Sequence, residues 1–221
     1  MVLWSGFARP IPAPPGAYTV RMTVDGYKDS KPFRLTRDPR ITASQRDLEE
    51  QYAFAVTISE RTNEANGAVM RIRGTKDKID KAAGTDSALL LAAGPLKEKL
   101  TAIEGEIHQY RSKSGEDPLN YPVKLNDQLA GLMDAVLSGS MRPPKQTREI
   151  YAKLSRSLQI QLDALKHLET NELESFNRSL KAKGIAAIVP VTPELTTATR
   201  RRGGGEEEER ERERGGEGDD N

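Results

Sequence analysis

The sequence predicts a mainly α-helical protein, an antiparallel bundle of about four amphipathic helices preceded by a short β-hairpin. Apolar residues recur every three or four positions over most of residues 41–190, the spacing of a helix that buries one stripe. Before them, residues 16–24 alternate apolar with other side chains and lead directly into Asp25-Gly26, a strong hairpin signal. Aromatic residues make up only 5% of the chain, so the core must consist mainly of Leu, Ile, Val and Ala.

Residues 1–40 are expected to form a Pro-rich lead and the hairpin. The prolines between positions 10 and 15 exclude a helix there, and the return strand is expected over residues 31–36. A lone hairpin is marginally stable in water. It should therefore dock on the helices behind it or, as we favour, on β structure outside this segment, as the remnant of a β-sandwich-like domain. One face of the first strand is expected to be half-buried: Tyr18, Val20, Met22 and Val24.

Residues 41–190 are expected to form the helical bundle. The first helix follows a cap at Thr42 or Ser44 and continues to about Ala83, before Gly84. The second follows Asp86 or Ser87, and Gly94-Pro95 leaves open that the helix proper begins at Pro95. After a linker over 112–123, a shorter third helix and a long fourth helix end near Gly139 and Gly184.

Residues 191–221 are expected to be a disordered charged tail. They contain three consecutive arginines, three glycines and a run rich in Glu and Arg, a composition that cannot bury a core.

Composition excludes several classes of protein. With 34 basic and 33 acidic residues the net charge is +1, too balanced for a dedicated nucleic-acid binder. The absence of cysteine excludes disulfides, thiolate nucleophiles and Cys-based zinc sites. No apolar run is long enough to span a membrane, and residues 1–16 lack the features of a signal peptide.

The candidate catalytic and metal-binding groups favour a structural interpretation. His108 and His167 fall on different expected helices, which favours surface or bundle-rim positions over a metal or catalytic role. The acidic pairs lie among lysines and are expected to be solvated rather than to face each other in a glycosidase cleft. No phosphate-binding or nucleophile-elbow motif occurs in the sequence. The acidic pairs considered are Glu49-Glu50, Glu104 with Glu106, and Glu169 with Glu172. We therefore expect no catalytic, cofactor-binding or metal-binding residues.

Four segments together resemble a known family. The run PGAYTVRMTVDG over 15–26, the tripeptide at 38–40, the stretch YPVKLNDQL over 121–129 and FNRSL over 176–180 are similar to the C-terminal region of large bacterial β-propeller proteins. These proteins carry BNR or sortilin-type repeats and are often labelled glycosyl hydrolases or sialidase-like. The residues singled out as a structural motif are Asp38, Pro39, Arg40, Tyr121, Pro122, Leu125, Asn126, Gln128, Phe176 and Asn177.

The resemblance covers roughly residues 2–190 and implies a C-terminal appendage whose propeller is absent. It also implies export to the periplasm or the exterior; without it, the cytoplasm is the alternative. The Asp-box pattern Ser-x-Asp-x-Gly-x-x-Trp does not occur, so no active residue of the family can be carried over.

Three functions follow as hypotheses. The first is a non-catalytic structural or interaction module whose partner is the propeller of the same parent protein, or a second copy of itself. The second is an independent helical adaptor or oligomerisation protein. The third is a glycoside hydrolase whose activity resides in the missing propeller.

Overall fold

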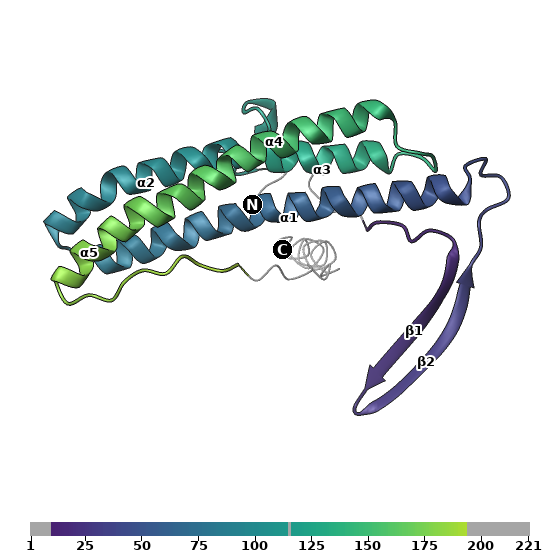
Figure 1. The fold of residues 1–221 in the computed structure, drawn as a ribbon, viewed down its shortest axis with the longest axis horizontal. Helices are drawn as coiled ribbons and strands as arrows, with labels where there is room; N and C mark the ends of the chain where they lie inside the picture. Colours follow the sequence, from purple (N-terminus) through teal and green to yellow (C-terminus); the bar gives the residue numbers. More distant parts are fainter. Residues whose placement is uncertain (1–9, 115, 194–221) are drawn as a thin grey trace, which may run out of the picture.

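The computed structural model describes residues 10–193 apart from residue 115, and it is mainly helical (Figure 1). The predicted helical bundle preceded by a β-hairpin is confirmed. The elements in chain order are β1 (Gly16–Val24), β2 (Tyr27–Leu35), α1 (Gln45–Ala83), α2 (Ser87–Ile107), α3 (Leu125–Val136), α4 (Lys145–Leu168) and α5 (Glu174–Ala182), with a 3₁₀ turn at Asp117–Leu119 and a π-helical turn at Glu169–Leu173.

The helices are arranged as three rods that run alternately up, down and up along the bundle. Helix α1 has 39 residues, roughly 58 Å at 1.5 Å per residue, and runs the whole length of the bundle. Helices α2 and α3 return along it one after the other, and both pack against α1. Helix α4, the π-helical turn and α5 form the third rod, which runs in the direction of α1 (Figure 1).

The core has two connected parts. The larger one fills the bundle where α1, α2, α4 and α5 meet, and includes Ile72, Leu100 and Leu180, each fully buried. The smaller one lies where α1 begins and joins Phe54, Ile58 and residues of α3. Tyr151 and Leu154 of α4 pack against both parts, so the two form one continuous interior.

The predicted helix boundaries agree closely with the structure. Helix α1 begins after Ser44, whose side chain accepts from the Asp47 amide, while the Asp47 carboxylate accepts from the Ser44 amide. This capping box satisfies amides that have no partner within the helix. Helix α2 begins after Asp86, which accepts from the amides of residues 88 and 89, and Pro95 lies inside it. The alternative start at Pro95 is therefore wrong, because the Asp86 cap already nucleates the helix.

The predicted fourth helix contains an irregular turn. Between α4 and α5 the backbone adopts π geometry over Glu169–Leu173. Here Thr170 donates to the Lys166 carbonyl and Asn171 to the His167 carbonyl, so side chains compete for the backbone acceptors of the preceding turn. Beyond α5, Gly184 with φ of 72° ends the rod, and residues 185–193 return in an extended conformation along α1 (Figure 1). The predicted tail lies mostly outside the described residues.

The hairpin is a two-stranded antiparallel sheet with no third strand among the described residues. Its register pairs Val24 with Tyr27 and continues to Gly16 with Leu35. Asp25 and Gly26 have φ angles of 45° and 85°, as a two-residue turn between twisted strands requires. The return strand begins at Tyr27 rather than at residue 31, because the tight turn lets pairing start at once.

Candidate interaction site

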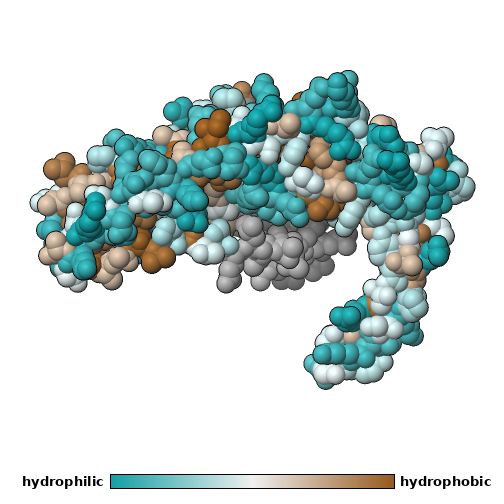
Figure 2. Space-filling view, in the orientation of Figure 1, coloured by the Kyte–Doolittle hydropathy of each residue, from teal (hydrophilic) through white to brown (hydrophobic). Residues whose placement is uncertain are grey.

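The hairpin carries an apolar face that nothing in the described structure covers. Register places Tyr18, Val20, Met22 and Val24 of β1 on the same face as Tyr27, Asp29, Lys31 and Phe33 of β2. The apolar side chains therefore form a row along β1 that ends at Phe33 and Tyr27, and the charged Asp29 and Lys31 lie beside this row. The fractions exposed are 56% for Val20, 52% for Met22 and 45% for Phe33. Of the four β1 side chains expected to be half-buried, only Tyr18 is; the other three are exposed, and the hairpin does not dock on the bundle. Figure 2 shows why: the hairpin stands clear of the helices. The favoured alternative, docking on β structure outside this segment, stays a prediction.

The opposite face of the hairpin is polar. It consists of Thr19, Arg21 and Thr23 on β1 with Lys28, Ser30 and Arg34 on β2. The aromatic pair Tyr18–Phe33 stabilises the base of the apolar face, with ring centroids 5.8 Å apart. The hairpin is thus two-faced, as a strand pair is when one side packs on another layer.

Contacts at its base attach the hairpin to the bundle. Gln45, the first residue of α1, donates to the Pro15 carbonyl at 2.7 Å, and the Tyr18 hydroxyl donates to the Pro14 carbonyl at 2.6 Å. On the other strand, Arg37 donates to the Ala43 carbonyl at 2.8 Å. Ile11 packs against the smaller part of the core. The chain is therefore held on both sides of the hairpin, and only the hairpin itself projects.

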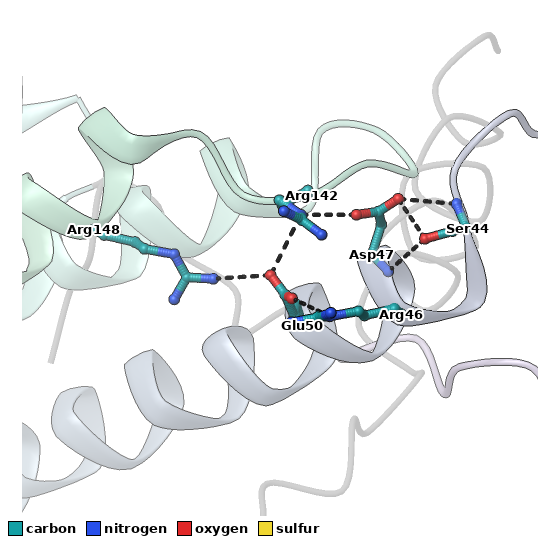
Figure 3. A network of polar contacts seen from close by, with 6 residues as sticks. All are labelled: Ser44, Arg46, Asp47, Glu50, Arg142 and Arg148. Carbon is teal, nitrogen blue, oxygen red and sulfur yellow. Dashed lines mark hydrogen bonds and ion pairs between the residues drawn. The ribbon is translucent and has the colours of Figure 1, made fainter.

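A network of charges fixes the end of the bundle from which the hairpin projects (Figure 3). Arg142, in the α3–α4 connection, contacts Asp47 at 2.8 Å and Glu50 at 3.4 Å. Arg46 and Arg148 also pair with Glu50. Hydrogen bonding by Ser44, reinforced by Arg142, lowers the pKa of Asp47. The network ties α1 to the α3–α4 connection, so the base of the hairpin rests on a braced helix end.

The Asp38-Pro39-Arg40 motif forms the turn between hairpin and bundle. The Arg40 guanidinium makes a bidentate ion pair with the Asp38 carboxylate, with contacts of 2.6 and 3.0 Å. The Asp38 side chain also accepts from the Arg40 amide, and these bonds lower the pKa of Asp38. Both side chains are exposed to solvent, so the motif shapes the connection between β2 and α1 and does not form a pocket.

The predicted motif at 121–129 reaches a buried polar centre through one residue. Asn126 is fully buried at the start of α3. Its amide nitrogen donates to Oδ1 of Asn66 on α1 at 3.0 Å and lies 3.2 Å from Nδ1 of His108, which caps the end of α2. Its oxygen accepts from the Asp127 amide. Asn126 thus joins the three helices at the point where α2 gives way to α3.

The other members of that motif surround this joint. Leu125 packs against the larger part of the core, whereas Pro122 and Gln128 are exposed. Gln128 donates to the Val123 carbonyl, and Gln109 donates to the Pro122 carbonyl, which anchors the connection to the end of α2. Tyr121 is half-buried. The motif therefore starts a helix and seals a joint between elements.

His108 belongs to the same centre and is only 2% exposed. The expected surface or rim position for His108 is wrong, whereas His167 is exposed as expected. Burial, together with the positive charge of Arg73, lowers the pKa of His108. Neutral imidazole suits this site, because an unprotonated Nδ1 can accept from Asn126. Sequence spacing did not reveal this contact, since its partner Asn126 is 18 positions away and lies beyond the α2–α3 connection.

Glu104 is buried, and Glu169 is half-buried with a side chain that is 8% exposed, against the expectation of solvated acidic pairs. Glu104 receives Arg73 at 2.6 Å and Lys76 at 2.9 Å. Burial raises the pKa of Glu104, but the hydrogen bonds from Lys76 and Arg73 outweigh it, so the pKa is lowered. Glu169 makes a bidentate pair with Arg71 at 2.6 Å. Both carboxylates are ionic links from α1 to a neighbouring rod.

The third motif anchors the returning C-terminal segment. Phe176 is buried in the core, and the next residue, Asn177, forms two hydrogen bonds with the backbone of Ile188, at 3.0 and 2.8 Å. Farther along, Lys78 donates to the Val189 carbonyl, and Val191 packs on Gly74 of α1. A Cβ at position 74 would lie 2.6 Å from Val191 Cγ2. Glycine at 74 therefore permits the close approach of this segment.

A groove along α2 is lined by three carboxylates, those of Asp80, Glu98 and Glu106. It runs past Gly105 and Tyr121. Its carboxylates Asp80 and Glu106 contact Lys97 and Lys124, respectively. A glycosidase needs one carboxyl group as acid and another as base or nucleophile facing the same bond. In this groove lysines contact two of the three carboxylates, Asp80 and Glu106.

Comparison with protein-family models, curated proteins and solved structures finds no match. Within residues 10–193, none of the helices has the length and apolar character needed to cross a membrane. The described geometry thus offers one conspicuous feature for recognition, the uncovered face of the hairpin.

Proposed function

We propose that the chain is a non-catalytic interaction module at the C-terminal side of a larger exported β-propeller protein of the glycosyl-hydrolase-like kind. In this proposal the apolar face of the hairpin packs on β structure of that protein, and the helical bundle acts as a stiff support. The observation that carries the proposal is the uncovered apolar face on β1 and β2.

The energetics support docking of this face. Its large side chains are about half exposed, and covering the rest of each contributes roughly 1 kcal/mol. Two packed sheets bury their facing side chains in this way, whereas an isolated hairpin leaves them in water. A β-rich partner supplies the second layer that the hairpin lacks.

The bundle supports this function by holding the hairpin at one end. The capping box and the arginines around Glu50 brace that end, and the base contacts hold both strands. Exposed apolar side chains of the bundle are dispersed over α1, α2 and α4, as with Met70, Leu91 and Ile160. A continuous stripe on one helix, as an adaptor bundle would need, is not among the described features.

The test begins with the genomic reading frame that encodes the chain. A segment of β repeats encoded ahead of residue 1 is expected, and this segment, produced separately, should bind chain 1–221 in size-exclusion chromatography with light scattering. Met22→Glu places a charge on the apolar face and should weaken the complex about tenfold or more. Thr23→Glu adds the same charge to the polar face and should have little effect.

Two results would contradict the proposal. One is a reading frame without β repeats. The other is a complex that tolerates Met22→Glu as well as Thr23→Glu, because the partner would then bind somewhere other than the apolar face.

A further inference from the structure

The two edges of the hairpin differ in what they offer to another strand. In an antiparallel pair, residues alternate between pairs that exchange backbone hydrogen bonds and pairs whose N–H and C=O groups point away. Val24 and Tyr27 flank the two-residue turn and form a bonded pair. Counting back from there, the outward-pointing residues are Ala17, Thr19, Arg21 and Thr23 on β1, and Lys28, Ser30, Pro32 and Arg34 on β2.

The β2 edge is protected against pairing. Pro32 falls at an outward-pointing position and provides no amide donor there. β2 also carries Lys28, Lys31 and Arg34, and lysine and proline are the residues that natural edge strands use to prevent association. By contrast, β1 has an uninterrupted row of donors and acceptors and a single charged residue, Arg21.

We propose that the β1 edge pairs with β1 of a second copy of this chain, antiparallel about a two-fold axis at Val20. Val20 is the midpoint of the nine-residue strand, so this register uses its full length. Thr19 then exchanges backbone hydrogen bonds with Arg21 of the other copy, and Ala17 with Thr23. The product is a continuous four-stranded sheet.

Side chains in this register are self-complementary. On the apolar face, Val20 meets Val20 of the second copy and Tyr18 meets Met22, a favourable sulfur–aromatic combination. On the polar face, Arg21 lies directly opposite Thr19, and the two Arg21 residues are diagonal neighbours, so no like charges lie directly opposite each other. The equivalent pairing of β2 about its midpoint Lys31 would place Lys31 against Lys31 and Lys28 against Arg34, which like-charge repulsion disfavours.

Pairing through this edge is separate from docking through the apolar face. The backbone of β1 points sideways in the plane of the sheet, and the apolar side chains point perpendicular to it. The dimer can therefore form whether or not a propeller covers the face, and the two ideas fail independently.

Cysteine cross-linking of the full chain tests the register. The native sequence has no cysteine, so one introduced thiol is the only one present. Val20→Cys should form a disulfide-linked dimer on mild oxidation, because a directly opposed pair that exchanges no backbone hydrogen bonds with each other has Cα atoms about 4.5 Å apart. Met22→Cys, on the same face, should not cross-link, because the two copies of residue 22 lie roughly 13 Å apart in this register.

A matched pair of proline variants tests the edge. Arg21 and Ser30 are cross-strand partners at outward-pointing positions, so Arg21→Pro and Ser30→Pro each remove one outward donor without breaking the ladder between β1 and β2. We expect sedimentation equilibrium to show a dimer for the wild type and for Ser30→Pro. Arg21→Pro should raise the dimer dissociation constant about tenfold or more. Nuclear Overhauser contacts between Tyr18 and Phe33 would verify that each variant keeps its hairpin.

Each result decides the proposal. Concentration-dependent protection of the Thr19, Arg21 and Thr23 amides from hydrogen exchange, with Lys28 and Arg34 unprotected, would support it. A monomer at all accessible concentrations, equal cross-linking of Val20→Cys and Met22→Cys, or equal loss of the dimer in both proline variants would overturn it. Protection of the β1 amides only when a β-repeat segment is added would also overturn it, because that segment would then be the occupant of the edge.

Discussion

At the scale of single residues, Asn126 is a buried side chain that connects three helices of the bundle. It lies at the start of α3, fully buried, and contacts Asn66 of α1 and His108 at the end of α2. A buried amide of this kind is stabilising only while its partners are present, because each partner left unpaired bears a desolvation cost.

Replacing Asn126 by alanine should therefore lower the free energy of unfolding by about 1–3 kcal/mol, since Asn66 and His108 lose a buried partner. Denaturant unfolding followed by circular dichroism measures this. The matched control is Gln128→Ala, two positions along α3 and exposed, which should change the free energy by less than about 0.5 kcal/mol. Equal effects of both substitutions would show that Asn126 is not a structural joint.

His108 should make stability depend on pH. Its pKa in the folded chain is lowered from 6.5 by burial and by Arg73, so above about 6.5 the imidazole is neutral in both states and its contribution is complete. As the pH falls below that value, the unfolded chain binds a proton that the folded chain resists. The loss is at most about 1.4 kcal/mol per pH unit and continues down to the lowered pKa.

The variant His108→Gln isolates this effect, because a glutamine oxygen can accept the same hydrogen bond without titrating in this range. Between pH 7 and pH 5 the wild type should lose stability relative to the variant in denaturant unfolding. Parallel pH profiles for the two proteins would mean that His108 is not held neutral. Glu104 affects the same comparison only at lower pH, because its own pKa is lowered.

Sequence patterns predicted the local features at this scale but not the long-range ones. The Ser44 and Asp86 caps depend on amides within three residues, so the sequence alone identifies them as candidates. The burial of His108 and Glu104 depends on which face of α2 meets its neighbours, and their partners Asn126 and Arg73 lie 18 and 31 positions away on other helices. Spacing along one helix contains no information on that contact.

At the scale of elements, the start of α1 determines how the hairpin joins the bundle. Ser44 closes the capping box and also contacts the Asp47 carboxylate that Arg142 binds. Loss of this cap would free the first turn of α1 and, with it, the Gln45 contact to Pro15.

Ser44→Ala should therefore cost about 0.5–2 kcal/mol of stability. It should also increase hydrogen exchange in the first turn of α1. Thr42→Ala is the appropriate control, because Thr42 is the other cap candidate by sequence but is exposed and precedes the observed cap. A larger effect at residue 42 than at residue 44 would contradict the observed start of the helix.

The elements themselves were largely predictable, and the exceptions have physical causes. Helical periodicity continues through residues 169–173, so the sequence predicted one unbroken helix where the structure has a π turn. Pro95 suggested a helix start, yet the Asp86 cap, about two and a half turns earlier, initiates the helix and places Pro95 in its interior. The identities of Asp86 and Pro95 do not by themselves show which of the two residues marks the start of α2.

At the scale of the whole molecule, the hairpin and the bundle are energetically separate. No residue of β1 or β2 belongs to either part of the core, and the base contacts involve residues outside the strands or at their very ends. Gly16 and Leu35 are cross-strand partners, so the chain enters and leaves the hairpin at adjacent points.

Replacing residues 16–35 by a short Gly-Ser loop should therefore leave the bundle folded. Thermal unfolding followed at 222 nm should shift by only a few degrees, because little buried apolar surface is removed. The control is Ile58→Ala, which removes a fully buried side chain and should cost about 2–5 kcal/mol. A large loss of stability on removing the hairpin would show that it is an integral part of the fold.

The path of the chain after α5 has a consequence for whatever follows it. The hydrogen bonds between Asn177 and Ile188 and the close contact of Val191 with Gly74 direct residues 185–193 back along α1. Residue 193 therefore lies beside α1 and not at the end of the bundle where α5 ends. A domain fused after residue 193 would consequently lie nearer the hairpin than one fused directly to the end of α5. A bulky residue at position 74 would push Val191 away from α1, and the chain would then leave the bundle nearer the end of α5.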